Sequence, residues 1–244
     1  MRIMNKAIIL LLTAFTATLA MHAAGSDALT TPWTYGFTAG AGALFPTSSL
    51  THNFKGTAVF TAGLTGNYRQ WRLNAALHFG QPSFKRPNIY QVTDAAGRDA
   101  QLRSAANASQ LGVALQLGYT VPCGSRVSVT PLAGGYWSRY GWRVNDIEWS
   151  KNDEGNDVFQ VTDTHSTSLS NVSWMVAVDV DILLHRHVTQ EPFFLSGSRA
   201  QLSSSLRITP LVAGARYSKS VPSVKGCFVG VTVAYLGLVK GLNY

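Results

Sequence analysis

The chain has 244 residues and a formal net charge of +8, and 46% of its residues are hydrophobic while only 13% are charged. Soluble proteins carry about 25% charged residues, so this composition argues against an ordinary water-exposed surface. Two cysteines are too few for a disulfide scaffold. Beyond the N-terminal segment, no stretch reaches the ~18 consecutive apolar residues of a membrane-spanning helix. These features predict a barrel whose outer face does not contact water.

The N-terminus has the form of a secretory signal peptide. Arg2 and Lys6 flank the start of an uncharged apolar run over residues 7–19, and small residues follow it. The run is shorter than the ~20 residues that a spanning helix needs, which favours a cleaved signal. We expect cleavage between Ala20 and Gly25. The predicted division is residues 1–24 for the signal peptide and 25–244 for one outer-membrane β-barrel domain.

The charge that remains after cleavage is mildly basic. Loss of Arg2 and Lys6 leaves 18 basic against 12 acidic residues, a net charge of +6. The basic residues are scattered singly and form no run, so nucleic acid is not an expected partner. Contact with anionic lipid headgroups is the expectation.

Alternation of apolar and polar residues predicts the strands. Residues 71–80 place Trp, Leu, Ala, Leu and Phe on one phase and Arg, Asn, Ala, His and Gly on the other. This period of two is that of a β-strand with one apolar face. The long runs cover roughly 9 to 12 residues, the length of a tilted strand that crosses hydrocarbon. The predicted strands, about eight, are 33–44, 57–68, 71–80, 109–119, 126–137, 172–184, 201–217 and 229–239.

The connections between these strands alternate in length. Tight turns are predicted at 66–70 and 121–125, and long polar segments at 45–56, 81–108 and 138–167. Short periplasmic turns and long extracellular loops are typical of outer-membrane barrels. The connections over 184–200 and 218–226 depart from this rule.

Aromatic residues gather near the strand ends and predict two girdles at the membrane interfaces. One girdle comprises Trp33, Tyr35, Tyr68, Trp71 and Tyr119, and the other comprises Phe79, Trp137, Tyr140, Trp174, Tyr217 and Phe228.

In these features the chain resembles the small outer-membrane β-barrel families, such as the OmpA transmembrane domain and the OmpX-like barrels. The resemblance is architectural and covers Trp33 to Tyr244. It implies an all-β, antiparallel up-and-down transmembrane barrel in the outer membrane of a Gram-negative-type bacterium. Members tend to end in an aromatic residue that the outer-membrane insertion machinery reads, and Tyr244 looks like that signal. Membrane anchoring, adhesion and host interaction are the functions implied.

We predict no catalytic, cofactor-binding or metal-binding residues. His185 and His187 would share one face of a strand, but no cysteine or carboxylate cluster accompanies them. His165, with Asp163 and Ser166 nearby, suggests a lipid-modifying hydrolase as an alternative. Sequence proximity does not establish such a pair, and the segment is typical of a polar loop.

The leading hypothesis is therefore a non-enzymatic barrel that anchors in the membrane, or whose loops 81–108 and 138–167 bind an extracellular macromolecule. A narrow porin-like channel is an alternative, although an eight-stranded barrel is just wide enough to be filled by side chains. A secreted lipocalin-like barrel that binds an apolar ligand is another.

The loop over residues 138–167 is predicted to be a hairpin. Its turn-forming cluster over residues 151–156 is flanked by alternating residues on both sides, so the hairpin would extend two strands beyond the membrane. We expect Trp142 and Trp149 to be the surface that contacts a partner.

Four charged residues on the polar phases are predicted to form a charge network in the lumen. We expect an ion pair between Asp179 and Arg207, with Arg72 reaching across toward Asp181, because unpaired charges in a narrow lumen are costly. Such a network would plug the barrel. Arg126 is expected on the same inward phase.

Two structural details are also expected. Pro131 and Pro210 lie inside predicted strands, and since a closed barrel has no edge, a β-bulge is predicted at each. Cys123 and Cys227 fall at opposite ends of the barrel. They are therefore expected to be too far apart for a disulfide.

Overall fold

The computed structural model describes most of the chain after residue 31. The described residues are 32–48, 50–53, 55–82, 89–93, 99–103, 108–155, 157–189, 199–217 and 224–242. The predicted signal peptide, its cleavage site and Tyr244 lie outside them. Within these ranges, no helix is long and apolar enough to cross a membrane.

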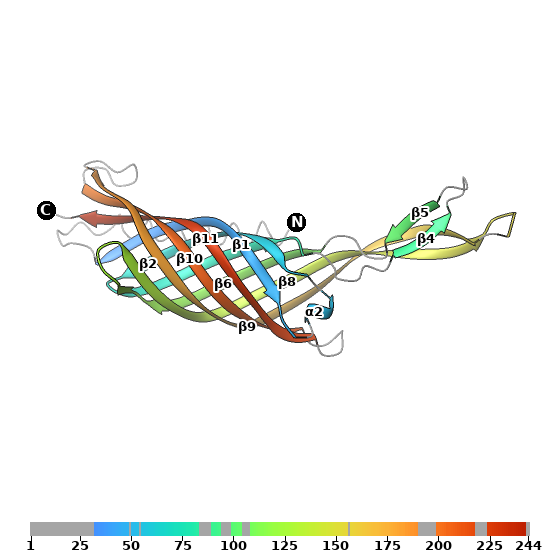
Figure 1. The fold of residues 1–244 in the computed structure, drawn as a ribbon, viewed down its shortest axis with the longest axis horizontal. Coiled ribbons are helices and arrows are strands. Elements are labelled where there is room, and N and C mark those ends of the chain that lie inside the picture. Colours follow the sequence, from blue (N-terminus) through green and yellow to red (C-terminus); the bar gives the residue numbers. More distant parts are fainter. Residues whose placement is uncertain are drawn as a thin grey trace, which may run out of the picture.

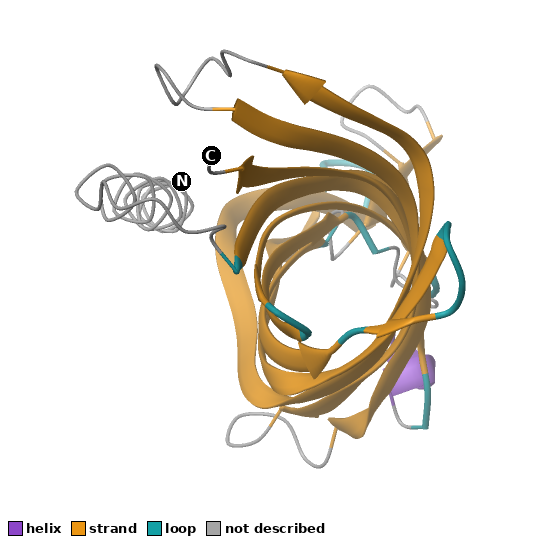
Figure 2. Cartoon of the chain, turned by 90° about the vertical axis from the view of Figure 1, so that its left-hand side faces the viewer, coloured by secondary structure: helices purple, strands orange, loops and turns teal. Residues whose placement is uncertain are grey.

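Eight of the described strands form a closed antiparallel barrel (Figures 1 and 2). Each strand pairs with its neighbour in the chain, and β1 pairs with β11 to close the barrel. The barrel strands are β1 Trp33–Pro46, β2 Thr57–Tyr68, β3 Trp71–Gly80, β6 Ser109–Tyr119, β8 Val127–Lys151, β9 Asp157–Thr189, β10 Arg199–Tyr217 and β11 Val224–Leu242. The short elements are α2 Leu50–Asn53, β4 Ile89–Thr93, β5 Asp99–Arg103 and β7 Val121–Pro122.

The predicted fold class is confirmed, and three strands have the bounds expected from alternation. These are β2, β3 and β6. The long segment 81–108, expected to be a loop, contains β4 and β5, which pair as a separate two-stranded sheet. The strands β8 and β9 run far beyond the predicted residues 137 and 172, because the segment between them is itself a paired hairpin.

The burial pattern is the reverse of that of a soluble barrel. Outward side chains are apolar and open, with Phe60, Leu115 and Val172 exposed by 70%, 58% and 78%. Inward side chains include buried polar and charged groups, among them Gln116 and Asp179. An apolar outer band around a polar interior is the arrangement of a transmembrane β-barrel. It is the opposite of the lipocalin-like alternative, which needs a charged outside.

The two ends of the barrel differ, and we name them by their connections. At the turn end, a two-residue turn joins β2 to β3 and a short segment joins β6 to β8. At the loop end lie α2, the β4–β5 sheet and the tip of the β8–β9 hairpin (Figure 1). The turn-end girdle is present as expected: Trp33 packs against Tyr68 at 4.7 Å, and Trp71 against Tyr119 at 5.4 Å between ring centroids.

The loop-end girdle is only partly as predicted. Phe79 and Trp174 are exposed on the outer face. Tyr140 and Phe228 were wrongly assigned to it, since both are buried and stack on each other inside the barrel at 5.6 Å. The alternation explains the error, because Tyr140 and Phe228 lie on the inward phase of their strands. The Tyr217 side chain lies outside the described residues.

The predicted bulges at the prolines are wrong. Pro131 pairs with Val178 and Pro210 with Val231, and neither ladder shifts register there. On the opposite edge of each proline two rungs are missing and the ladder resumes in the same register, so the absent N–H removes ladder bonds without inserting a residue. Register shifts occur instead between Ser204 and Ser205 and between Asp146 and Ile147.

The cysteines are unpaired, as expected from their positions. Cys123 is exposed beside β7 at the turn end, and Cys227 is half-buried near the start of β11 at the loop end.

Candidate functional site

The buried charged groups of the described barrel interior come from three strands. Arg72 lies on β3, Asp179 and Asp181 on β9, and Arg207 on β10, and all four are buried. Each alternates with outward apolar neighbours: Arg72, for example, stands between Trp71 and Leu73, which are half exposed. The period of two therefore places these side chains in the lumen.

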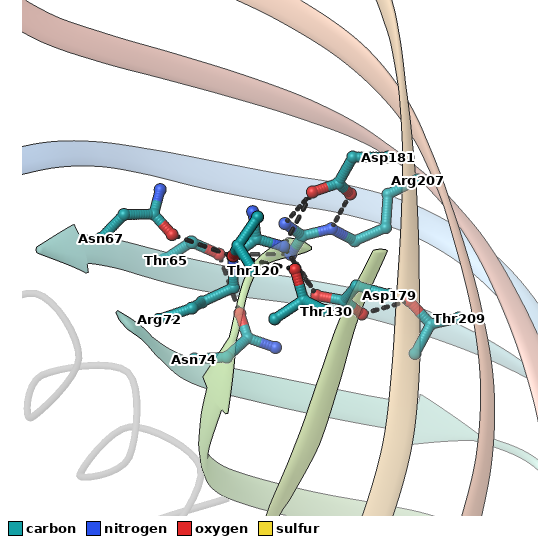
Figure 3. A network of polar contacts seen from close by, with 10 residues as sticks. All are labelled: Thr65, Asn67, Arg72, Asn74, Thr120, Thr130, Asp179, Asp181, Arg207 and Thr209. Atoms are coloured by element: carbon teal, nitrogen blue, oxygen red, sulfur yellow. Dashed lines mark hydrogen bonds and ion pairs between the residues drawn. The ribbon is translucent and has the colours of Figure 1, made fainter. Parts of the chain in front are cut away.

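The four side chains meet in one network (Figure 3). Arg72 Nη1 lies 2.7 Å from Asp181 Oδ2 and 3.3 Å from Asp179 Oδ2. Arg207 Nη1 lies 3.1 Å from Asp179 Oδ2, and its Nε lies 2.7 Å from Asp181 Oδ1. Both the pair between Asp179 and Arg207 and the reach of Arg72 to Asp181 are present. Each aspartate also contacts the second arginine, which was not anticipated.

A second layer of polar groups holds this network in place. Thr209 Oγ1 donates a hydrogen bond to Asp179 Oδ1 at 2.7 Å, and Arg72 Nε donates one to Asn67 Oδ1 at 2.9 Å. Thr65 Oγ1 accepts from Arg207 Nη1 at 3.3 Å and donates to Asn74 Oδ1 at 2.8 Å. These residues were missed, although their inward phase could have identified them as lumen residues.

The network crosses the barrel. Strands β3 and β9 are not neighbours in the sheet, so the contacts of Arg72 with the two aspartates span the lumen. Two positive and two negative charges balance there. Such balance matters because a buried charge that loses its partner costs about 3 to 5 kcal/mol.

Toward the loop end the lumen is filled by packed side chains, both apolar or aromatic ones and polar ones such as Gln110 and Ser138. Tyr136 and Met175 are buried in a cluster with smaller residues from the neighbouring strands, and the His78 ring meets the Tyr136 ring edge-on at 5.9 Å. Above them, Tyr140 and Phe228 pack with Leu50 of α2. The described lumen is thus occupied by the charge network near the turn end and by packed side chains near the loop end.

Arg126 does not belong to the network. It lies in the turn between β7 and β8 and is exposed, because the inward phase of β8 begins only after that turn.

The hairpin of β8 and β9 leaves the barrel beyond the last rung that β8 shares with β6, which pairs Ser109 with Gly141. From there the β8–β9 ladder continues to the rung of Lys151 with Asp157. We call this part, residues 142–151 and 157–167, the ribbon. The expected hairpin is thus present, and the backbones of Trp142 and Trp149 lie on it. The side chains of both tryptophans lie outside the described residues, so their role stays a prediction.

The contacts of His165 bear on the alternative of a hydrolase. His165 Nδ1 lies 3.1 Å from Asp146 Oδ2 on the exposed ribbon. Ser166 is its neighbour in the same strand, so the two side chains point to opposite faces, while Ser168 Oγ accepts a hydrogen bond from Arg139. The structure therefore does not bring a serine of this segment onto His165.

His185 and His187 stack at 6.3 Å between ring centroids and are exposed near the turn end. Within the described part of the chain, no group of three or more His, Cys, Asp or Glu residues has the arrangement of a metal site.

Comparisons with known proteins give structural neighbours only. No protein-family model matches the sequence. No curated protein matches it. The structure is similar to that of Ail, the attachment invasion locus protein of Yersinia pestis, at 9% identity and a TM-score of 0.40, covering 86% of this chain and 98% of Ail.

Two further neighbours have the same character. Neisserial surface protein A is 15% identical with a TM-score of 0.39, covering 85% of this chain and 96% of that protein. The outer-membrane protein OprG from Pseudomonas aeruginosa is 9% identical with a TM-score of 0.38, covering 89% and 98%. The similar structures are thus bacterial surface and outer-membrane proteins. Because identity and TM-score are low, the fold assignment rests on the strand pairing and burial described above.

Proposed function

We propose that the chain is a non-enzymatic, non-conducting outer-membrane barrel of a Gram-negative-type bacterium that presents the ribbon to an extracellular macromolecule. In the proposed orientation in the membrane, the turn end faces the periplasm and the loop end faces the outside of the cell. Short periplasmic turns and long outer loops support that orientation.

The ribbon is the observation that carries the proposal. It continues the β8–β9 ladder from residue 142 to residue 151, about 30 Å at ~3.3 Å per residue. A free two-stranded hairpin is marginally stable in water. Here the β4–β5 sheet lies beside β9 (Figure 1). A long paired segment that leaves the barrel and has a second sheet beside it is suited to contact a partner.

The decisive experiment removes the ribbon and leaves the barrel. Gly141 pairs with Ser168, so an Asn-Gly turn can join these residues, because this dipeptide favours two-residue hairpins. We expect heat-modifiable gel migration of the shortened protein to be unchanged, since the barrel ladders remain. Cells that display it should lose attachment to cultured host cells, the kind of contact that the resemblance to surface barrels implies. Equal attachment by both forms would contradict the proposed role of the ribbon.

A second comparison tests the two tryptophans without shortening the chain. Trp142→Ala combined with Trp149→Ala should weaken attachment at least as much as any other pair of ribbon substitutions. Glu148→Gln with Glu154→Gln is the matched control, since both glutamates are exposed on the same hairpin. A larger loss of attachment in the control variant would show that the tryptophans are not the main contact with the partner.

The narrow-channel alternative predicts conductance in planar bilayers. The charge network and the packed aromatic side chains occupy the lumen, so we expect the purified protein to show no single-channel steps. Regular steps from the unmodified protein would favour the channel.

A further inference from the structure

A cavity of 210 Å³ opens at the turn end, directly below the charge network. Arg72 and Asp181 form part of its wall, together with residues of the β7–β8 turn and of β9, β10 and β11. One water needs about 10 to 15 Å³ of such space, so the cavity has room for a small organic molecule. We call it the vestibule.

The charges around the vestibule are unbalanced. Arg126 and Arg186 line it and are exposed, and neither forms an ion pair or side-chain hydrogen bond with another described residue. The described carboxylate in its wall is Asp181, whose two oxygens already face Arg72 and Arg207. Lys240 follows Leu238 on the inward phase of β11 and adds a further positive charge at this end. The vestibule therefore carries positive charge that the neutral network above it does not compensate.

The rest of the wall is amphipathic. Leu183, Leu236 and Leu238 line one part, and serine hydroxyls line another. Leu236 and Leu238 lie on β11 opposite Ser205 and Ser203 of β10. Arginines fix an anionic group by charge-assisted hydrogen bonds, and leucines bury an aliphatic one.

We propose that the vestibule binds an anionic amphiphile, a carboxylate, phosphate or sulfate head on an aliphatic chain, that enters from the turn end. Arg126 and Arg186 hold the head, and the three leucines contact the chain. The charge network closes the vestibule above and keeps the ligand out of the upper lumen. The site is separate from the ribbon, so it stands or falls independently of the proposed surface role.

The test uses the full-length barrel in nanodiscs of phosphatidylcholine with methyl-labelled leucine. Hexanoate should shift the methyl signals of Leu183, Leu236 and Leu238 saturably. Hexanol, which lacks the charge, and inorganic phosphate, which lacks the chain, should each bind at least about tenfold more weakly. One charged hydrogen bond accounts for roughly that factor in the case of hexanol, and the burial of a few methylene groups does so in the case of phosphate. Equal binding by hexanol or by phosphate would overturn the proposal, as would the absence of saturable shifts.

Two variants connect the signal to the arginines. Arg126→Gln with Arg186→Gln should weaken hexanoate binding by about tenfold or more while the unfolding midpoint stays unchanged, because both side chains are exposed and outside the network. Arg143→Gln, an exposed arginine on the ribbon, is the control and should bind as the unmodified protein does. Unchanged affinity in the double variant would refute the assignment of the head group.

The source of the ligand is decided in the same system. Phosphatidylglycerol added to the nanodiscs should weaken hexanoate binding if membrane lipid heads reach the vestibule, and should have no effect if the ligand is a free periplasmic solute. Either result is consistent with the proposed site and identifies the source of its ligand.

Discussion

The barrel and the ribbon are made of the same two strands but meet different surroundings. Inside the barrel, β8 and β9 each pair on both edges, and their outward residues, such as Val172, are apolar and exposed. In the ribbon the described ladder of each strand is the one it shares with the other, and charged residues such as Arg143 and Glu148 are exposed. Closure and an apolar outer face therefore stabilise the barrel, whereas the exposed ribbon is available to contact a partner.

The largest expected effect concerns the charge network, which exists only in the barrel. Asp179→Asn leaves Arg207 and Arg72 with one carboxylate fewer in a buried site, so we expect a loss of about 3 to 5 kcal/mol in the free energy of unfolding. Urea denaturation of the protein in lipid vesicles measures it.

A double-mutant cycle with Arg207→Gln gives the coupling between the two side chains. Its value should be well above the ~0 to 1 kcal/mol of solvated pairs. The same change at the exposed pair of Asp146 and His165 on the ribbon is the control, and it should lower stability by less than about 1 kcal/mol. Additive effects in the network would show that the pair does not act as a buried unit.

The next effect distinguishes residues that face lipid from residues that face water. Leu115→Arg, on the outer face near the middle of β6, should cost about 2 to 4 kcal/mol, because a charge there faces hydrocarbon. Val161→Arg on the ribbon should change stability by within about 0.5 kcal/mol, as for other exposed positions. Folding into vesicles followed by denaturation compares the two. Equal costs would place both residues in the same environment.

Close packing between strands gives a smaller effect. A methyl group on Gly134 would overlap the Leu115 carbonyl oxygen and lie 2.7 Å from Gln116 Cα, whereas one on Gly135 would meet nothing within 4 Å. Gly134→Ala should therefore cost about 1 to 3 kcal/mol, measured by the same unfolding assay. Its neighbour Gly135→Ala is the control and should be neutral.

The smallest effect is confined to the ribbon. Gly155 has a φ of 81° in the turn between β8 and β9, where its N–H bonds the Asn152 carbonyl. Gly155→Ala should cost about 1 kcal/mol locally, because that backbone conformation disfavours a side chain. Hydrogen exchange should quicken in the ribbon amides and stay unchanged in barrel strands such as β2. Faster exchange in both regions would mean that ribbon and barrel unfold together.

Much of the barrel was accessible from alternation alone. The runs that became β2, β3 and β6 had the expected bounds, because each covers one membrane-spanning strand with a clear apolar phase. The charged lumen residues were found by the same rule, since Arg72 and Asp179 lie on the polar phase of regularly alternating strands. Tyr140 and Phe228 also follow this rule and lie on the inward phase, although their positions near strand ends are those of girdle residues.

Other features depended on contacts that local sequence does not encode. The β4–β5 sheet lies in a segment without long alternation, so nothing marked it as paired. The gaps beside Pro131 and Pro210 were mistaken for bulges, because a missing N–H and an inserted residue leave the same trace in sequence. The actual register shifts, near Ser204 and Asp146, fall at positions without a glycine or proline signal.

Local periodicity was sufficient to set the strand identity of most barrel segments and the face on which each side chain lies, because both follow from the geometry of a single extended chain. Closure and register decided the rest. Which arginine meets which aspartate, and which leucines and arginines share the vestibule, depends on the stagger of eight strands around a ring. That stagger is fixed by the hydrogen-bond ladders between neighbours and is not present in any one strand.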